Sequence, residues 1–261
     1  MGENKYKFIR CKRQGHVYWI ILNRPEVLNA LHPPAHEELD AAFNVFQDDP
    51  ELWIAILTGI GEKSFCVGND LKFQAAHAPQ QVVLPKSGFG GITRRYDCDK
   101  PIIAAVNGIA LGGGFEMALA CDIIISSDNA VFGLPEPRVG MMARTGVHRL
   151  VRAVPSYVAM SMILTGRRIT ADEAKRIGVV CEVIPGKHLE KTATKWADEV
   201  LQCAPLAVRA SKQAVRLGLH KALEASLEAI YPLEEKMRHS QDFIEGPRAY
   251  VEKRNPEWKG Y

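Results

Sequence analysis

Two glutamates, Glu116 and Glu136, are the side chains of this sequence best placed to do chemistry. Glu116 ends the segment LGGGFE, residues 111–116, and Glu136 lies further along between two prolines. Glycines let a backbone approach a ligand closely, and the first N–H groups of a helix have no partners within it. A helix that begins at this glycine run would therefore offer N–H donors to an anion, such as the oxygen of an enolate. Tight packing of the helix against a strand is the structural alternative for the three glycines, and the residues leave both open. The two carboxylates beside the glycine run predict acid/base catalysis.

The surroundings of the two glutamates differ. Glu116 falls in the first turn of a helix predicted over 113–120, where the helix dipole also stabilises a negative charge. Its neighbours are apolar, and a carboxyl in such a setting is either paired or has a shifted pKa. Glu136 lies on a stiff Pro-Glu-Pro segment, and a surface ion pair with Arg138 is the structural alternative for it.

A second segment could add another backbone donor. The segment FCVGNDLK, residues 65–72, follows a predicted strand and contains a turn at Gly68 and Asn69. The turn could bring an N–H group to the same anion. A plain turn capped by Asp70 is the alternative, and the residues leave both open.

The strands and helices predicted by hydrophobic pattern alternate along the chain. Continuous apolar runs at 52–58, 102–106 and 123–125 suit strands buried on both faces, and two further strands are predicted at 8–10 and 17–22. Helical periodicity occurs at 35–47, 113–120 and 156–164. This alternation predicts an α/β fold with right-handed crossovers.

Two regions depart from this alternation. Residues 77–98 have weak periodicity, and we expect a mobile loop or short helix of the kind that covers a site. Beyond residue 188 the strands stop, and three helices are predicted at 189–203, 206–218 and 221–240. We therefore expect a catalytic core over residues 1–187 and a helical oligomerisation module over 188–261.

The composition is that of a globular protein. Of 261 residues, 47% are hydrophobic and 24% charged, and a net charge of +3 falls short of the basic excess typical of nucleic-acid binding. The six cysteines form no CxxC pair and lie in apolar contexts, which suggests buried, reduced thiols. No secretory signal and no apolar run long enough to span a bilayer is found. These absences suit a cytosolic or an organelle-luminal protein alike, and of the two we expect a cytoplasmic protein without a membrane partner.

Four common motifs are excluded, two of them by a single position. Residues 59–64 lack the glycine that precedes lysine in a phosphate-binding loop. Met117 occupies the last glycine position of the dinucleotide fingerprint. No G-x-S-x-G nucleophile elbow occurs, and no histidine pair has the spacing of a zinc hydrolase. We therefore expect no metal.

Taken together, these segments resemble the crotonase (enoyl-CoA hydratase/isomerase) superfamily. The motif around Glu116, followed by Pro135 and Glu136, is highly specific for that family. The matching stretches are 23–25, 28–31, 65–72, 100–122, 132–140, 164–169 and 174–178. The C-terminal segments 245–247, 252–254 and 256–260 resemble the branch that contains carnitinyl-CoA dehydratases.

The resemblance implies an acyl-CoA substrate and a role for each site residue. The backbone N–H groups of Asn69 and Gly113 would form an oxyanion hole for the thioester carbonyl. Glu116 and Glu136 would hold the water that adds to Cβ, and Glu136 would exchange the proton at Cα. Further contacts to the acyl-CoA are expected from Leu28, Ala30, Gly68, Asp70, Leu71, Lys72, Gly112, Met141 and Arg144.

The family also implies a spiral of ββα units, a C-terminal trimerisation module, and a homotrimer or homohexamer. No cofactor is expected beyond the coenzyme A of the substrate. Retention of both glutamates favours hydration and dehydration. Carnitinyl-CoA dehydration, double-bond isomerisation, and a catalytically silent scaffold or RNA-binding protein are the alternatives.

One segment departs from the family pattern. Residues 141–148, MMARTGVH, are one residue shorter than usual and contain a single glycine and an added Arg144. In the family this segment shapes the acyl pocket. Arg144 could contact a polar or anionic acyl group, or it could be a solvated surface residue.

Overall fold

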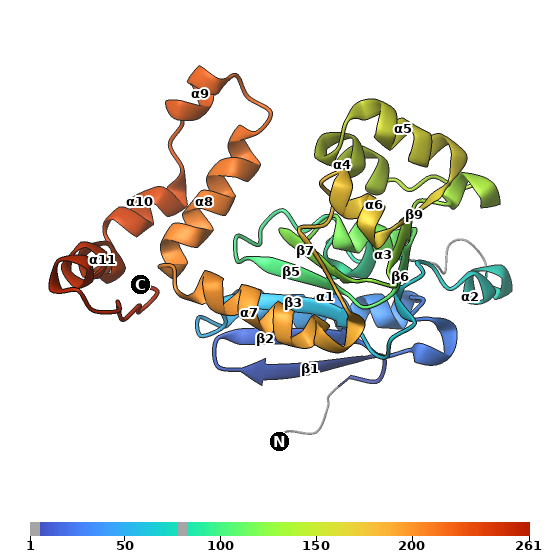
Figure 1. Ribbon diagram of the computed structural model, residues 1–261, viewed down its shortest axis with the longest axis horizontal. Coiled ribbons are helices and arrows are strands. Elements are labelled where there is room, and N and C mark those ends of the chain that lie inside the picture. Colours follow the sequence, from blue (N-terminus) through green and yellow to red (C-terminus); the bar gives the residue numbers. More distant parts are fainter. Residues whose placement is uncertain (1–5, 78–82) are drawn as a thin grey trace.

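The computed structural model describes residues 6–77 and 83–261, whose strands form two sheets (Figure 1). The larger sheet has the order β1-β2-β3-β5-β7-β10, with β1 and β2 antiparallel and all other neighbours parallel. The smaller sheet has the order β4-β6-β8-β9, and only its β8–β9 pair is antiparallel. The strands are β1 (Ile9–Gln14), β2 (Val17–Leu22), β3 (Ile54–Gly59), β4 (Ser64–Cys66), β5 (Ile102–Val106), β6 (Ile109–Leu111), β7 (Ile123–Ser127), β8 (Val131–Gly133), β9 (Arg168–Thr170) and β10 (Glu182–Ile184).

Helices alternate with pairs of strands along the first part of the chain. The α-helices are α1 (Pro33–Asp48), α2 (Leu71–Ala76), α3 (Gly113–Ala118), α4 (Gly146–Ala153), α5 (Ser156–Thr165), α6 (Ala171–Arg176), α7 (Leu189–Leu201), α8 (Pro205–Gly218), α9 (Leu223–Leu227), α10 (Pro232–Arg238) and α11 (Gln241–Glu252). Short 3-10 helices are η1 (Pro25–Val27), η3 (Phe89–Gly91), η4 (Glu136–Val139) and η5 (Gly186–His188). Three times the chain passes from the larger sheet to the smaller sheet and into a helix: β3-β4-α2, β5-β6-α3 and β7-β8-η4-α4. The predicted α/β fold of ββα units is confirmed.

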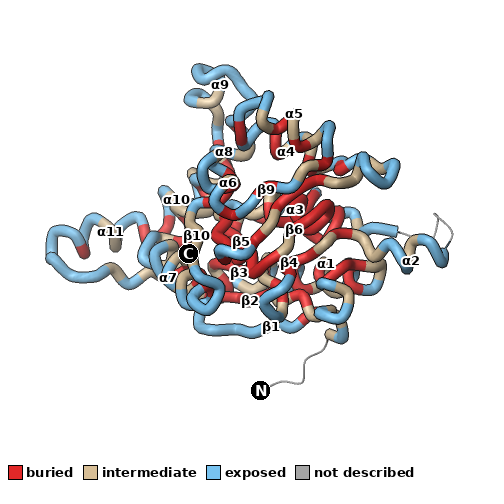
Figure 2. Tube along the Cα trace, turned by 45° about the vertical axis from the view of Figure 1, so that its right-hand side comes forward, coloured by how far each residue is buried: buried red, intermediate tan, exposed pale blue. Residues whose placement is uncertain are grey.

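The central strands of the larger sheet, β2, β3, β5 and β7, are buried on both faces, which explains their unbroken apolar runs. Within β3, Ile54 and Ile56 belong to one buried cluster with α7, whereas Ala55 and Leu57 belong to a second cluster with α1 and α3. Successive side chains of a strand point to opposite faces, so both sets are covered at once. Buried residues accordingly concentrate in the strands and α3, while α9 and α11 are largely exposed (Figure 2).

The C-terminal helices beyond α7 extend away from the core, whereas α7 lies across the larger sheet (Figure 1). α8 is tied to the core by ion pairs from Lys212 to Asp122 at 2.8 Å and from Arg216 to Asp99 at 2.9 Å. Among the described residues, no helix has the length and apolar character needed to cross a membrane.

The predicted C-terminal helices are partly wrong. The single helix expected over 221–240 is two helices, α9 and α10, because Pro232 cannot continue a helix and instead occupies the first turn of α10. Helix α11 and the smaller sheet were not predicted. All four strands of that sheet are three residues long, too short for a period-2 pattern to register.

The segment 77–98 is more buried than a surface loop. Its residues 78–82 lie outside the described part, but the expected short helix is present as η3, and Phe89 and Ile92 belong to the core. Gly90 and Gly91 have positive φ, and their missing Cβ atoms let the turn lie against α3 and α1. The turn is therefore fixed in the core rather than loose over it.

The cysteine prediction is right for some positions only. All six cysteines are free thiols, and Cys66 and Cys98 are buried. Cys181 and Cys203 are exposed, contrary to the expectation. Both lie where elements end, Cys181 just before β10 and Cys203 just after α7, so apolar sequence neighbours do not cover them.

Gly114 is a sensitive test of this packing. A Cβ at this position would lie 2.0 Å from the backbone oxygen of Cys66, so the Gly114→Ala substitution must push α3 away from the end of β4. We expect a loss of about 1–3 kcal/mol or more in the free energy of unfolding, measured by urea denaturation. Gly186→Ala is the matched control, since its nearest neighbour would be Ser127 Cβ at 3.7 Å. Equal stability of the two variants would contradict this packing.

Candidate active site

The turn after β4 and the start of α3 approach each other at glycines. A Cβ on Gly68 would lie 3.0 Å from the backbone nitrogen of Gly113 and 3.2 Å from the backbone oxygen of Leu111. Gly112 has a φ of 54° and provides the turn from β6 into the helix. A side chain on Gly68 would separate the two segments, so glycine serves backbone proximity here.

The hydrogen bonds on either side of Asn69 leave its own N–H group pointing away from the neighbouring residue Leu31. Leu31 forms a parallel bridge with Asn69: Leu31 N–H donates to Gly68 O, and Asp70 N–H donates to Leu31 O, both at 2.8 Å. In such a bridge the residue between the two bonds points its N–H away from the neighbouring strand. Within the described residues nothing accepts a hydrogen bond from Asn69 N–H. Gly113, the first residue of α3, has no intrahelical acceptor for its N–H either.

A cavity of about 140 Å³ lies beside these two residues. Eight of the predicted site residues line it, including both glutamates. Its lining comprises Val67, Gly68, Asn69, Leu71, Phe89, Gly112, Gly113, Glu116, Pro135, Glu136, Val139, Met141 and Met142. Gly112 turns the chain into α3. The other predicted lining residues come from the turn after β4, from the first residue of α2, from α3 and from the segment after β8, so the ββα repeats bring the site together.

Glu116 is buried and rigidly held. Its Oε1 atom accepts three hydrogen bonds: from Thr145 N–H at 2.7 Å, from the Thr145 hydroxyl at 2.8 Å and from Gly146 N–H at 2.6 Å. These donors come from the start of α4, which closes over α3. Gly146, the single glycine of the segment 141–148, therefore helps to orient Glu116 through its N–H group.

Glu136 has a contrasting environment. A Cβ on Gly112 would lie 3.0 Å from Glu136 Oε1, so the carboxyl group packs directly on the glycine run. Its Oε2 atom is buried without a hydrogen-bond partner. Burial first, and then the nearby charge of Glu116, raises the pKa of Glu136 to about 7. The alternative surface pair with Arg138 does not form, because Arg138 Nε donates to Thr165 O at 2.9 Å.

Five predicted contacts lie outside the cavity lining. Asp70 caps α2 by accepting from Phe73 N–H and pairs with Arg24 at 3.0 Å. Arg24 also donates to Ala30 O at 2.6 Å, so Asp70 and Ala30 brace the Gly68–Asn69 turn. The other three, Leu28, Lys72 and Arg144, are exposed at the surface.

Sequence reasoning missed several lining residues. Phe89 and Val67 contribute apolar wall, and Val139 and Met142 lie at its exposed side. The cluster of glycines at 88–91 was the only available signal for Phe89, since glycines often mark close packing. Across residues 6–77 and 83–261 no group of three or more His, Cys, Asp or Glu side chains is arranged to hold a metal ion.

A spiral of ββα units whose cavity joins two carboxyl groups to a glycine-rich helix start defines a crotonase-type protein. The chain belongs to the enoyl-CoA hydratase/isomerase family, whose family model matches residues 12–261.

Individual relatives are similar over nearly the whole chain. A carnitinyl-CoA dehydratase of Proteus mirabilis is 42% identical over 252 residues, which cover 95% of this chain and 96% of the relative. The solved enoyl-CoA hydratase of Bacillus anthracis has a TM-score of 0.89 at 36% identity, covering 98% of this chain and 100% of that one. That of Mycobacterium tuberculosis H37Rv has a TM-score of 0.90 at 32% identity, covering 97% and 99%.

The raised pKa of Glu136 makes stability depend on pH. Its folded pKa of about 7 exceeds its ordinary value of 4.5, so between these pH values the folded protein keeps a proton that the unfolded chain releases. The stabilisation is complete below pH 4.5 and is lost as pH rises to about 7. We expect the unfolding free energy of wild type, minus that of Glu136→Gln, to fall across this window and stay constant above it. Urea denaturation in pH steps measures the difference, and a flat difference would refute the assignment.

Proposed function

We propose that this protein adds water reversibly across the 2,3 double bond of an acyl-CoA thioester, as an enoyl-CoA hydratase-like lyase. The observation that carries the proposal is the pair of glutamates on one cavity with the Asn69 and Gly113 backbone. The family membership and the enoyl-CoA hydratase neighbours support the same reaction class.

The backbone donors would stabilise the charge that develops during addition. When the water oxygen attacks Cβ, electrons move toward the thioester oxygen and an enolate forms. An oxygen between the N–H groups of Asn69 and Gly113 gains both hydrogen bonds as its charge grows. One donor of this kind is typically worth roughly 2.7–4 kcal/mol in the transition state, and an apolar wall increases its effect.

The two glutamates would divide the handling of water. Glu116, fixed by three donors, orients the water toward Cβ. Glu136, with a pKa of about 7, can release and take up a proton near neutrality, which suits a group that passes the water's proton to Cα. The water thus gives its hydroxyl to Cβ and its proton to Cα, and both carboxyl groups end as they began.

The assembly is also part of the proposal. We infer a homotrimer or homohexamer built from a core of residues 1–187 and a helical module of 188–261, located in the cytoplasm. Apolar side chains left uncovered in the single chain support contacts through this module; the most exposed are Leu219, Leu223, Leu227, Ile230, Ile244, Tyr250 and Val251. The coenzyme A of the substrate would be the only cofactor-like group, and nucleic acid would not be a partner.

A second candidate reaction is carnitinyl-CoA dehydration. The 42% identity to the Proteus mirabilis enzyme favours it, and the chemistry uses the same water and thioester handling. Enoyl-CoA isomerisation is less favoured because both glutamates are retained. A silent scaffold or an RNA-binding role is opposed by the intact site and by the modest net charge of +3.

Substitution of the glutamates tests the site directly. With crotonyl-CoA as substrate, we expect Glu116→Gln and Glu136→Gln each to lower the hydration rate by about 10²-fold or more, because each removes a proton-handling or water-orienting group. Loss of the absorbance of the conjugated thioester measures the rate. Glu190→Gln, an exposed change on α7, is the control and should match wild type. If both glutamine variants retain the wild-type rate, the site assignment is wrong.

Product analysis separates the reaction candidates. Incubated separately with crotonyl-CoA, carnitinyl-CoA and a 3-enoyl-CoA, the enzyme is expected to turn over crotonyl-CoA to the 3-hydroxyacyl product with the highest kcat/KM. A higher kcat/KM for carnitinyl-CoA would assign the dehydratase reaction instead. Conversion of the 3-enoyl-CoA alone would leave only isomerisation.

A further inference from the structure

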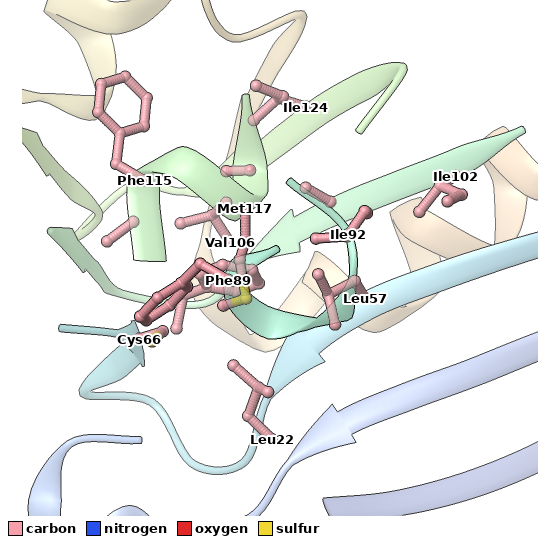
Figure 3. Close-up of a cluster of buried hydrophobic side chains, with 14 of the residues drawn as sticks. Leu22, Leu57, Cys66, Phe89, Ile92, Ile102, Val106, Phe115, Met117 and Ile124 are labelled. Atoms are coloured by element: carbon pink, nitrogen blue, oxygen red, sulfur yellow. The ribbon is translucent and has the colours of Figure 1, made fainter. Parts of the chain in front are cut away.

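One wall of the cavity is the ring of Phe89, which packs on the backbone of Gly113. A Cβ on Gly113 would lie 2.5 Å from two carbons of that ring, so ring and peptide are in direct contact. Figure 3 shows Phe89 among the buried side chains near α3, with Cys66 and Met117. The position of this ring therefore bears on the N–H donor assigned to Gly113.

The turn that carries Phe89 is held by contacts on two sides. Gly90 lies against Met117 of α3, and Gly91 lies against the backbone of Asp40 in α1. Both glycines have positive φ. Among the described residues, His36 of α1 is the side-chain acceptor for a backbone N–H of η3: the Gly90 N–H group donates to its Nδ1 at 3.0 Å.

His36 is an unusual choice for its position. It is 1% exposed, and the other buried residues of α1 are all apolar: Ala35, Leu39, Ala42, Phe43 and Phe46. Because Nδ1 accepts a hydrogen bond, the neutral ring carries its proton on Nε2, and Nε2 is buried without a partner. Burial, with a minor contribution from His32, lowers the pKa of His36 to about 3, so the ring stays neutral. An orphaned donor of this kind costs stability, about 1–3 kcal/mol.

The ring of His36 also contacts Phe89 directly. The two rings meet edge to face, with centroids 4.5 Å apart and planes at 68°. We propose that His36 is a positioning residue: through the Gly90 N–H and the edge contact it holds the Phe89 ring on Gly113 and so shapes the oxyanion side of the cavity. The inference rests on the proposed function. His36 does not line the cavity, so it acts through Phe89 and not on the substrate.

Two substitutions at His36 separate its acceptor from its bulk. In His36→Asn, Oδ1 can take the place of Nδ1 and accept from Gly90, while nothing replaces Nε2. In His36→Leu, the volume is largely kept but no acceptor remains. With crotonyl-CoA, we expect His36→Asn to keep kcat within about threefold of wild type, and His36→Leu to lose about tenfold or more in kcat with a smaller change in KM.

Two further measurements distinguish positioning from a general structural role. The unfolding free energy of His36→Leu should stay within about 1 kcal/mol of wild type, because the orphaned Nε2 donor is gone while the Gly90 N–H group loses its acceptor. Phe89→Leu should lose kcat to a similar extent, and the double variant should lose no more than either single one. If His36→Leu does not fold, Phe89→Leu still decides, because undiminished kcat in that variant overturns the proposal.

The overturning results are specific. Full turnover in His36→Leu, or an equal loss in His36→Asn and His36→Leu, would exclude positioning through the Nδ1 acceptor. Crystal structures of the two variants give a readout that needs no activity: the Phe89 ring should leave Gly113 in His36→Leu and stay in His36→Asn. A ring in place in both overturns the proposal. If wild type is inactive toward crotonyl-CoA but the Phe89 ring still leaves Gly113 in His36→Leu, the proposed function is wrong and the positioning role of His36 stands.

Discussion

The close approach of two backbone segments is the constraint on which the site depends. The end of β4 and the start of α3 meet at Gly68 and Gly114, where a Cβ would crowd the backbone of the opposite segment. The parallel ββα repeats bring these segments together at the same edge, and the bridge from Leu31 turns the Asn69 N–H away from its neighbour. Two unpaired donors result on one cavity, which is the arrangement an enolate oxygen requires.

The two carboxyl groups gain different properties from their surroundings. Three donors from the start of α4 fix Glu116, whereas Glu136 rests on Gly112 with one oxygen unpartnered. The shortened segment after Glu136 thus still supplies the contacts that orient Glu116. Under the proposed function, this contrast assigns the orientation of the water to Glu116 and proton exchange near neutral pH to Glu136.

Elements marked by a local pattern or a motif could be predicted from the sequence. Apolar runs identified β3, β5 and β7, and the glycine run located Glu116 at the start of α3. Contacts between distant segments were not predictable: the Leu31–Asn69 bridge, the Thr145 donors to Glu116, and the link from His36 to Phe89. Each depends on tertiary placement. Local rules alone also missed the three-residue strands of the smaller sheet.

The central claim is that the backbone N–H groups of Asn69 and Gly113 polarise the thioester carbonyl. Butyryl-CoA labelled with ¹³C at the carbonyl has no double bond to hydrate, so its bound state can be observed without turnover. The account predicts a downfield carbonyl shift and a lowered C=O stretching frequency on saturation of wild-type enzyme, because hydrogen bonds draw electron density to the oxygen. Saturable binding with the carbonyl at its free-solution shift and frequency would contradict it.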